Sequence, residues 1–148
     1  MAITDENIDV LLVDDSAIDA ELTLHGLRSG DQARRVLWLQ DGDVALDYLF
    51  RRGRYAGRSD AGPRMVLLDL KMPRVDGIDV LRAIKGDPAT SMIPVVIMTS
   101  SQEEFDIAKS YDLGANSYIV KPVHLHELMG IAQKTGLYWL STNRPRIG

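Results

Sequence analysis

Cysteine is absent from this 148-residue sequence. Its absence excludes a disulfide framework, a thiolate metal site and a cysteine nucleophile. A chain without cysteine is compatible with any compartment, and it suits the reducing cytoplasm, where we expect this protein to reside.

Long apolar runs are missing as well. No stretch approaches the roughly 20 consecutive apolar residues of a membrane-spanning helix. The first residues, Met-Ala-Ile-Thr-Asp-Glu-Asn, lack the basic segment and apolar run of a signal peptide. A formal net charge of -4 disfavours nucleic-acid binding through bulk electrostatics. We therefore expect neither a membrane nor a nucleic acid among the partners.

The apolar content is sufficient for one folded domain. Hydrophobic residues make up 45% of the chain, and its length fits one compact domain better than two. We predict a single domain over residues 1–148, with its core at 8–140, short tails at 1–7 and 141–148, and no output domain.

Two kinds of segment alternate along the chain. Runs rich in β-branched residues predict strands at 8–13, 35–40, 65–70, 95–99 and 116–120. Longer stretches of helical periodicity predict helices at 16–30, 42–52, 78–85, 101–114 and 124–140. The strands are almost continuously apolar, which implies burial on both faces, so the expected fold is α/β, with a doubly wound parallel sheet of five strands between five helices.

Local signals refine this pattern. Ser16 with Asp19, and Ser101 with Glu104, have the spacing of a helix-capping box. Residues 53–63 predict an exposed loop. Nearby arginines form a basic patch, which we interpret as a solvated surface rather than a binding site; they are Arg51, Arg52, Arg54, Arg58 and Arg64.

Function in such sheets gathers at the carboxyl ends of the strands. The first predicted strand is followed by Asp14 and Asp15, and Asp69 lies at the end of the third. Thr99 ends the fourth strand and Lys121 follows the fifth. Three carboxylates, a hydroxyl and an amine are therefore expected at one edge of the sheet.

Three neighbouring carboxylates repel one another, and a hard divalent cation relieves that repulsion. Mg²⁺ is the expected cofactor, with Mn²⁺ as an alternative. Such a site suits phosphoryl transfer onto Asp69 as the nucleophile, with Mg²⁺ and Lys121 neutralising the phosphoryl oxygens. Thr99 could donate a hydrogen bond to the product phosphate.

Several motifs, in this order and at these spacings, resemble the receiver-domain family of bacterial response regulators. They are Val-Asp-Asp at 13–15, Leu-Leu-Asp-Leu-Lys-Met-Pro at 67–73, Asp-Gly at 76–77, Ile-Pro-Val-Val-Ile-Met-Thr-Ser at 93–100, Gly-Ala at 114–115 and Lys-Pro at 121–122. The resemblance covers nearly the whole chain. It implies a flavodoxin-like topology with strand order 2-1-3-4-5 and a sensor histidine kinase as phosphoryl donor.

The resemblance also implies metal-site roles. Asp69 matches the phosphoacceptor and a metal ligand. Asp15 matches the direct carboxylate ligand of Mg²⁺, Asp14 the water-mediated one, and the backbone carbonyl of Lys71 the third protein ligand.

Three further positions match the family's phosphate contacts and switch. Thr99 and Lys121 match the groups that contact the phosphate, and Tyr118 matches the aromatic residue that turns inward when the threonine engages it. The bond between Lys121 and Pro122 matches one that is cis in the family.

A narrower resemblance is to single-domain regulators of cyanobacterial and bacterial phytochromes. It is carried by the lengthened segment 51–63, Ser-Tyr at 110–111, Ala-Asn-Ser-Tyr-Ile-Val-Lys-Pro-Val at 115–123 and Tyr-Trp-Leu at 138–140. Many of those relatives have Glu-Asp-Asn where this chain has Asp14, Asp15 and Ser16. The resemblance implies a bacteriophytochrome as a candidate kinase and a homodimer through the fourth helix, fifth strand and fifth helix. Tyr111, Tyr138 and Trp139 fit either that dimer surface or the core.

Two other functions remain as alternatives. An aspartate-nucleophile phosphatase needs an acid two residues after the nucleophile, where this chain has Lys71. A receiver-like interaction module that never takes phosphate would not need the complete set of acids. Nucleotide-binding glycine loops do not follow the first strand. We therefore expect no enzyme activity beyond self-phosphorylation and self-dephosphorylation.

Overall fold

The computed structural model describes residues 7–29 and 34–145. Its centre is a parallel sheet of five strands in the order β2-β1-β3-β4-β5, which confirms the predicted topology. The strands are β1 (Val10–Val13), β2 (Val36–Leu39), β3 (Met65–Leu68), β4 (Val95–Thr99) and β5 (Ser117–Val120).

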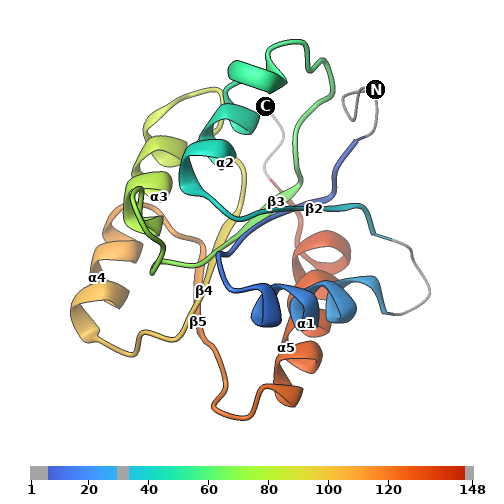
Figure 1. The fold of residues 1–148 in the computed structure, drawn as a ribbon, viewed down its shortest axis with the longest axis vertical. Helices are drawn as coiled ribbons and strands as arrows, with labels where there is room; N and C mark the ends of the chain where they lie inside the picture. The colour runs from blue at the N-terminus through green and yellow to red at the C-terminus, as the bar shows by residue number, and fades with distance from the viewer. Residues whose placement is uncertain (1–6, 30–33, 146–148) are drawn as a thin grey trace.

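Helices cover both faces of this sheet. Figure 1 shows α1 (Ala17–Arg28) and α5 (His126–Leu137) on one face, and α2 (Gly42–Leu49), α3 (Gly77–Gly86) and α4 (Glu104–Asp112) on the other. In β1, Leu11 and Val13 belong to the core under α2 and α3, whereas Val10 and Leu12 belong to the core under α1 and α5. A strand buried on both faces has no polar face, which explains its continuous apolar sequence.

Parallel register brings the strand ends to one edge. Val13 of β1 lies beside Leu68 of β3, and Thr99 of β4 beside Val120 of β5. The Asp69 amide donates to the carbonyl of Val13 at 3.0 Å, so the loops after β1 and β3 leave the sheet at the same level.

The two predicted capping boxes differ in outcome. Ser16 is the N-cap of α1, and its hydroxyl accepts from the Asp19 amide at 3.3 Å. Helix α4 begins at Glu104 with Glu103 as its N-cap, so the prediction of a capping box formed by Ser101 and Glu104 was wrong. Because Ser101 lies two residues before that N-cap, its hydroxyl accepts from the Glu103 amide at 3.3 Å and donates to Asp106 at 2.5 Å.

The segment predicted as a solvated basic loop is partly buried. A 3-10 turn at Gly53–Tyr55 follows α2, and Tyr55 and Arg58 are buried. The Arg58 guanidinium pairs with Asp60 at 2.6 Å and lies 4.1 Å from the centre of the Tyr48 ring. The prediction was wrong for Arg58 because a carboxylate and an aromatic face compensate its charge in the interior.

The end of the chain also refines the prediction. Helix α5 stops at Leu137, and a π-helical turn at Tyr138–Thr142 follows. Trp139 packs against the core under α1 and α5, whereas Tyr111 and Tyr138 are each 49% exposed. Within residues 7–29 and 34–145, no helix is long and apolar enough to span a bilayer.

Candidate functional site

Three carboxylates meet at the carboxyl edge of the sheet. Asp14, Asp15 and Asp69 each offer an oxygen, and these oxygens lie within 4.8 Å of one another. Asp14 and Asp69 are buried, whereas Asp15 faces solvent. The set follows from the adjacent ends of β1 and β3, and its all-oxygen donors fit a hard divalent cation.

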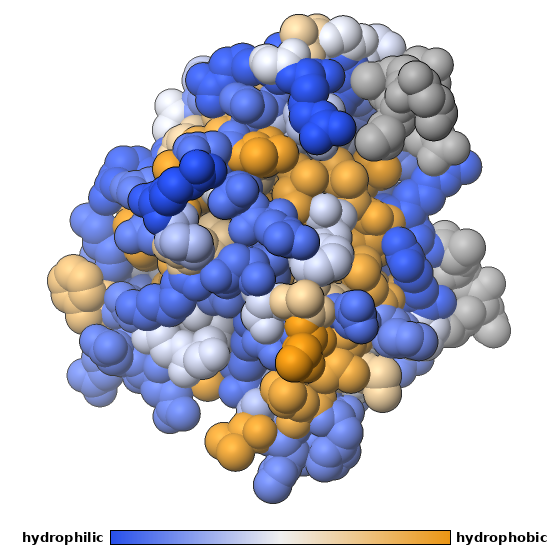
Figure 2. All heavy atoms as spheres, in the orientation of Figure 1, coloured by the Kyte–Doolittle hydropathy of each residue, from blue (hydrophilic) through white to orange (hydrophobic). Residues whose placement is uncertain are grey.

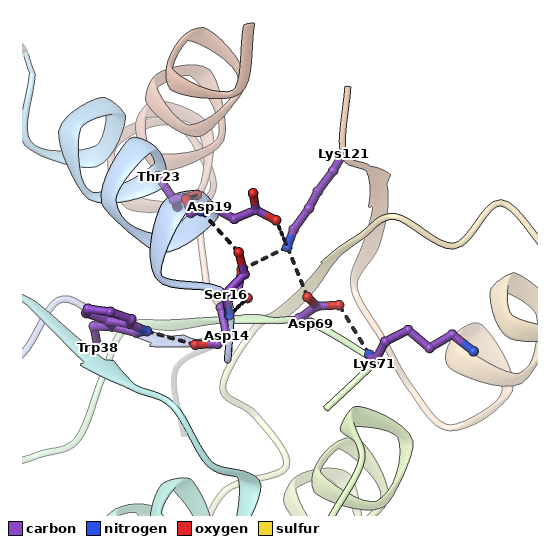
Figure 3. Close-up of polar contacts among 8 residues, drawn as sticks. All are labelled: Asp14, Ser16, Asp19, Thr23, Trp38, Asp69, Lys71 and Lys121. Atoms are coloured by element: carbon purple, nitrogen blue, oxygen red, sulfur yellow. Dashed lines mark hydrogen bonds and ion pairs between the residues drawn. The ribbon is translucent and has the colours of Figure 1, made fainter. Parts of the chain in front are cut away.

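A buried lysine directly after β5 contacts this cluster. The Lys121 ammonium lies 2.9 Å from a carboxylate oxygen of Asp14, 2.9 Å from one of Asp69 and 2.8 Å from one of Asp19 (Figure 3). Burial alone would lower the pKa of Lys121. The hydrogen bonds to Asp19 and Asp14 and the attraction of Asp14 and Asp69 outweigh burial, so this pKa lies above its usual value.

The acids compete for this single ammonium. Burial raises the pKa of Asp14 to about 6, against the opposing contributions of Lys121 and the Ser16 amide, and the charge of Asp69 adds to the rise. Three carboxylates contact one ammonium and Asp15 lies beside two of them, so the edge carries an excess of negative charge. A divalent cation would relieve that excess.

Thr99 supplies an unpaired hydroxyl. Its side chain is fully buried, and among the described residues its hydroxyl has no hydrogen-bond partner. A buried hydroxyl without a partner is costly, at roughly 1–3 kcal/mol. Thr99 ends β4, next to β5, which Lys121 follows. An anion bound at Asp69 could accept a hydrogen bond from the Thr99 hydroxyl.

A second polar network lies beside the carboxylates. The Lys71 ammonium lies 3.2 Å from the Asp106 carboxylate, which also accepts the hydroxyl of Ser101. The Ser101 hydrogen bond, followed by Lys71, keeps the pKa of Asp106 low despite its burial. Tyr118 donates its hydroxyl to the Ser101 carbonyl at 2.9 Å. The network therefore links the loop after β3 to α4 and β5.

Comparison with known proteins places this arrangement in a family. The model of the response regulator receiver domain matches residues 10–133. The chain belongs to the receiver-domain family.

Two relatives of this receiver domain align with it along nearly the whole chain. The probable methanogenesis regulatory protein FilR2 of Methanothrix harundinacea is 41% identical over 91% of this chain and 85% of its own. Response regulator Rcp1 of Synechocystis sp. is 36% identical over 90% of this chain and 89% of its own.

Solved structures point the same way. The phosphorylated cyanobacterial phytochrome response regulator RcpA superposes with a TM-score of 0.89, at 37% identity, over 96% of this chain and all of that one. The Mn(2+)-bound form of Rcp1 superposes with a TM-score of 0.87, at 34% identity, over 95% of this chain and 99% of that one. The predicted resemblance to phytochrome regulators is confirmed.

Sequence reasoning about this receiver missed two contacts at the acidic cluster. Asp19 was noted only for its capping spacing, yet its carboxylate contacts Lys121. Trp38 on β2 donates its ring N–H to the carbonyl of Asp14 at 2.8 Å (Figure 3). Strand pairing of β1 with β2 brings Trp38 there, and no local pattern signals it.

One family-based expectation was wrong. No peptide bond among the described residues is cis, so Lys121 and Pro122 are joined by a trans bond. Trans is the lower-energy form of such bonds by about 0.5–1 kcal/mol. The Lys121 amide donates to the Thr99 carbonyl at 2.7 Å, so this trans arrangement still presents the lysine at the sheet edge.

Proposed function

We propose that this receiver takes a phosphoryl group from a histidine kinase onto Asp69 in a Mg²⁺-dependent reaction. The observation that carries the proposal is the surroundings of Asp69. Its carboxylate is buried, accepts a hydrogen bond from the Lys121 ammonium at 2.9 Å and belongs to the cluster of three acids.

The metal would be held by the acidic cluster. Asp15 and Asp69 would ligate Mg²⁺ directly, Asp14 through a water, and Lys71 through its backbone carbonyl. Mn²⁺ is the alternative, consistent with the Mn(2+)-bound form of the relative Rcp1. The cation would neutralise charge that develops on the transferring phosphoryl group.

The chain's own groups would divide the remaining work. A carboxylate oxygen of Asp69 attacks the phosphorus of a phosphohistidine, the new O–P bond forms as the P–N bond breaks, and the histidine leaves with the electron pair. Lys121 faces an equatorial phosphoryl oxygen. The Thr99 hydroxyl, which has no hydrogen-bond partner in the described part of the chain, donates to another, which removes the cost of burying it without a partner.

The Thr99 hydroxyl would also start the conformational switch. A shift of Thr99 toward the phosphate changes the space beside Tyr118 on the adjacent strand β5. Tyr118 would then leave the Ser101 carbonyl and repack inward, which changes the surface of α4, β5 and α5. Phe105 and Tyr111, both exposed on α4, make this surface a candidate for homodimerisation.

The partner would be a sensor histidine kinase, with a bacteriophytochrome as the candidate suggested by RcpA. Exposed apolar side chains follow the catalytic residues in the sequence: Ile18 after Asp15, and Val123 and Leu125 after Lys121. Figure 2 shows apolar surface at the lower end of the molecule, where the connection between β5 and α5 lies in Figure 1. A kinase could bury this surface while its phosphohistidine reaches Asp69. The proposal includes a cytoplasmic location.

The proposal is tested with acetyl phosphate as a small donor. Intact-mass analysis should show one added phosphoryl group on the protein incubated with Mg²⁺. The addition should disappear without Mg²⁺ and in Asp69→Asn. Labelling that survives Asp69→Asn would contradict the acceptor assignment, and a protein that is never labelled would instead favour a phosphate-independent interaction module.

A further inference from the structure

The Lys121 ammonium has three hydrogens, and each has a different carboxylate as its acceptor. Two of these acids, Asp14 and Asp69, belong to the cluster that could hold a metal. The third acid, Asp19, is outside that cluster, at 2.8 Å from the same nitrogen. Figure 3 shows Asp19 reaching Lys121 from α1, opposite Asp69.

Asp19 is fixed by its own helix. Its amide donates to the Ser16 hydroxyl at 3.3 Å, and its carbonyl accepts the Thr23 hydroxyl at 2.8 Å. Its side chain is 17% exposed, and the lysine side chain is 4% exposed. A rigid helical turn therefore presents the carboxylate, whereas Lys121 carries four methylene groups that need a support to stay in one place.

The partners of Lys121 must change during the proposed reaction. A metal ion would draw oxygens of Asp14 and Asp69 toward itself, and a phosphoryl oxygen would replace the Asp69 oxygen at the ammonium. Asp19 is the one partner that neither event removes.

We infer that Asp19 is a positioning residue, which holds the Lys121 ammonium toward Asp69 before and after phosphorylation. This inference rests on the proposed function. Asp19 would contact neither the cation nor the phosphoryl group. It would act through Lys121. Orientation of a catalytic group is worth up to about 100-fold in rate for a displacement of about 1 Å.

The chain offers a matched control on α3. Asp79 has the same place in its helix as Asp19, because its amide also donates to the side chain of the N-cap, Asp76, at 3.1 Å. Its carboxylate pairs with the exposed Arg82 instead of a lysine at the site. Asp79→Ala removes a first-turn acid without touching Lys121.

The test measures phosphorylation of the full chain by acetyl phosphate at saturating Mg²⁺. Asp19→Ala should lower the maximal rate by about 10- to 100-fold. Asp19→Asn keeps an oxygen acceptor for the ammonium, so it should fall between Asp19→Ala and wild type. The concentration of acetyl phosphate at half-maximal rate should change less than the rate itself. Mg²⁺ affinity, read from the fluorescence of Trp38 in a Trp139→Phe background, should change by less than about fivefold, since Asp19 is not a ligand.

Three outcomes would overturn the inference. The first is an Asp19→Ala rate equal to that of Asp79→Ala. The second is a faster rate, which would mean that Asp19 withholds Lys121 from the phosphoryl group. The third is an Asp19→Asn rate no better than that of Asp19→Ala. Asp19→Asn preserves the shape of the side chain, so its comparison with Asp79→Asn decides the matter where truncation costs the fold. If wild type itself is not labelled at Asp69, the proposed function fails, and that result is distinguishable from these three.

Discussion

Two buried or half-buried lysines lie at opposite edges of the same sheet. Lys121 follows β5 and shares three carboxylates, whereas Lys85 of α3 donates to the carbonyls of Ser91 and Ile93 and to the amide oxygen of Asn116, at 2.9–3.0 Å. Ser91 and Ile93 precede β4 and Asn116 precedes β5, so Lys85 lies at the amino edge of the sheet. Burial lowers the pKa of Lys85. The pKa of Lys121 is raised, because the hydrogen bonds to Asp19 and Asp14 and the charges of Asp14 and Asp69 outweigh the effect of burial.

The difference distinguishes a lysine that stabilises the fold, Lys85, from one that serves the proposed phosphorylation site, Lys121. At the amino edge one cation donates to three neutral oxygens. At the carboxyl edge negative charge is in excess and the Thr99 hydroxyl has no partner among the described residues. Natural proteins accept such local conflict mainly at functional sites.

Lys121→Met and Lys85→Met should differ most in the rate of phosphorylation by acetyl phosphate. Loss of a preorganised charge at the phosphoryl group costs about 10²- to 10³-fold, which we expect for Lys121→Met. Lys85→Met should stay within about twofold of wild type, since its ammonium serves the opposite edge. Intact-mass time courses at saturating Mg²⁺ measure both rates, and equal losses would show that the two edges are not functionally distinct.

Lys85 should matter more for the stability of the fold than for the rate of phosphorylation. Lys85→Met leaves the carbonyls of Ser91 and Ile93 without this donor, while Asn116 keeps the Val95 amide as a donor. The change should lower the free energy of unfolding by about 2–3 kcal/mol. Urea denaturation monitored by circular dichroism gives this value. Thr90→Val is a useful comparison, because it removes a hydroxyl that donates to Ile84 near the same end of α3 but leaves the lysine in place. A Lys85→Met variant as stable as wild type would contradict the assigned role.

Asp14 should make stability depend on pH without metal. Its pKa rises to about 6 in the folded protein from an ordinary value of 3.8, chiefly because burial disfavours its charged form. The folded state therefore binds the proton more tightly than the unfolded state. The resulting stabilisation is fully present below pH 3.8 and is lost as the pH rises through about 6.

The Asp14 prediction is measured against Asp14→Asn. Between pH 4 and pH 7 the unfolding free energy of wild type should fall relative to the variant by about 1–2 kcal/mol. Saturating Mg²⁺ should reduce this slope, because the metal favours the ionised acid. A pH-independent difference would show that Asp14 ionises as an ordinary carboxyl group.

The smallest effect is expected at the half-exposed network. Lys71 is 62% exposed in its pair with Asp106, and surface pairs contribute about 0.2–1 kcal/mol. Asp106→Asn should therefore change the rate of phosphoryl loss from Asp69 by no more than about fivefold. Decay of the labelled mass after removal of acetyl phosphate measures it. A change as large as that of Lys121→Met would place Lys71 in the chemistry itself.

Local sequence patterns sufficed for much of this molecule. Continuous apolar runs predicted the strands, and the rule that function lies at their carboxyl ends selected Asp14, Asp69 and Lys121, which the structure brings together. The contact of Asp19 with Lys121 was not predicted, because it spans 102 positions and depends on α1 lying beside the end of β5. Arg58 escaped for a similar reason, since its burial depends on Asp60 and the Tyr48 ring rather than on its own polarity.

In the proposed reaction the carboxylate of Asp69 alone accepts the phosphoryl group. Borohydride reduction of the protein labelled in the presence of Mg²⁺, followed by peptide mapping, tests it directly. An acyl phosphate at Asp69 would be reduced to homoserine at position 69 alone, with no such product in unlabelled protein. Homoserine at position 14 or 15, or a label that resists reduction, would contradict the account.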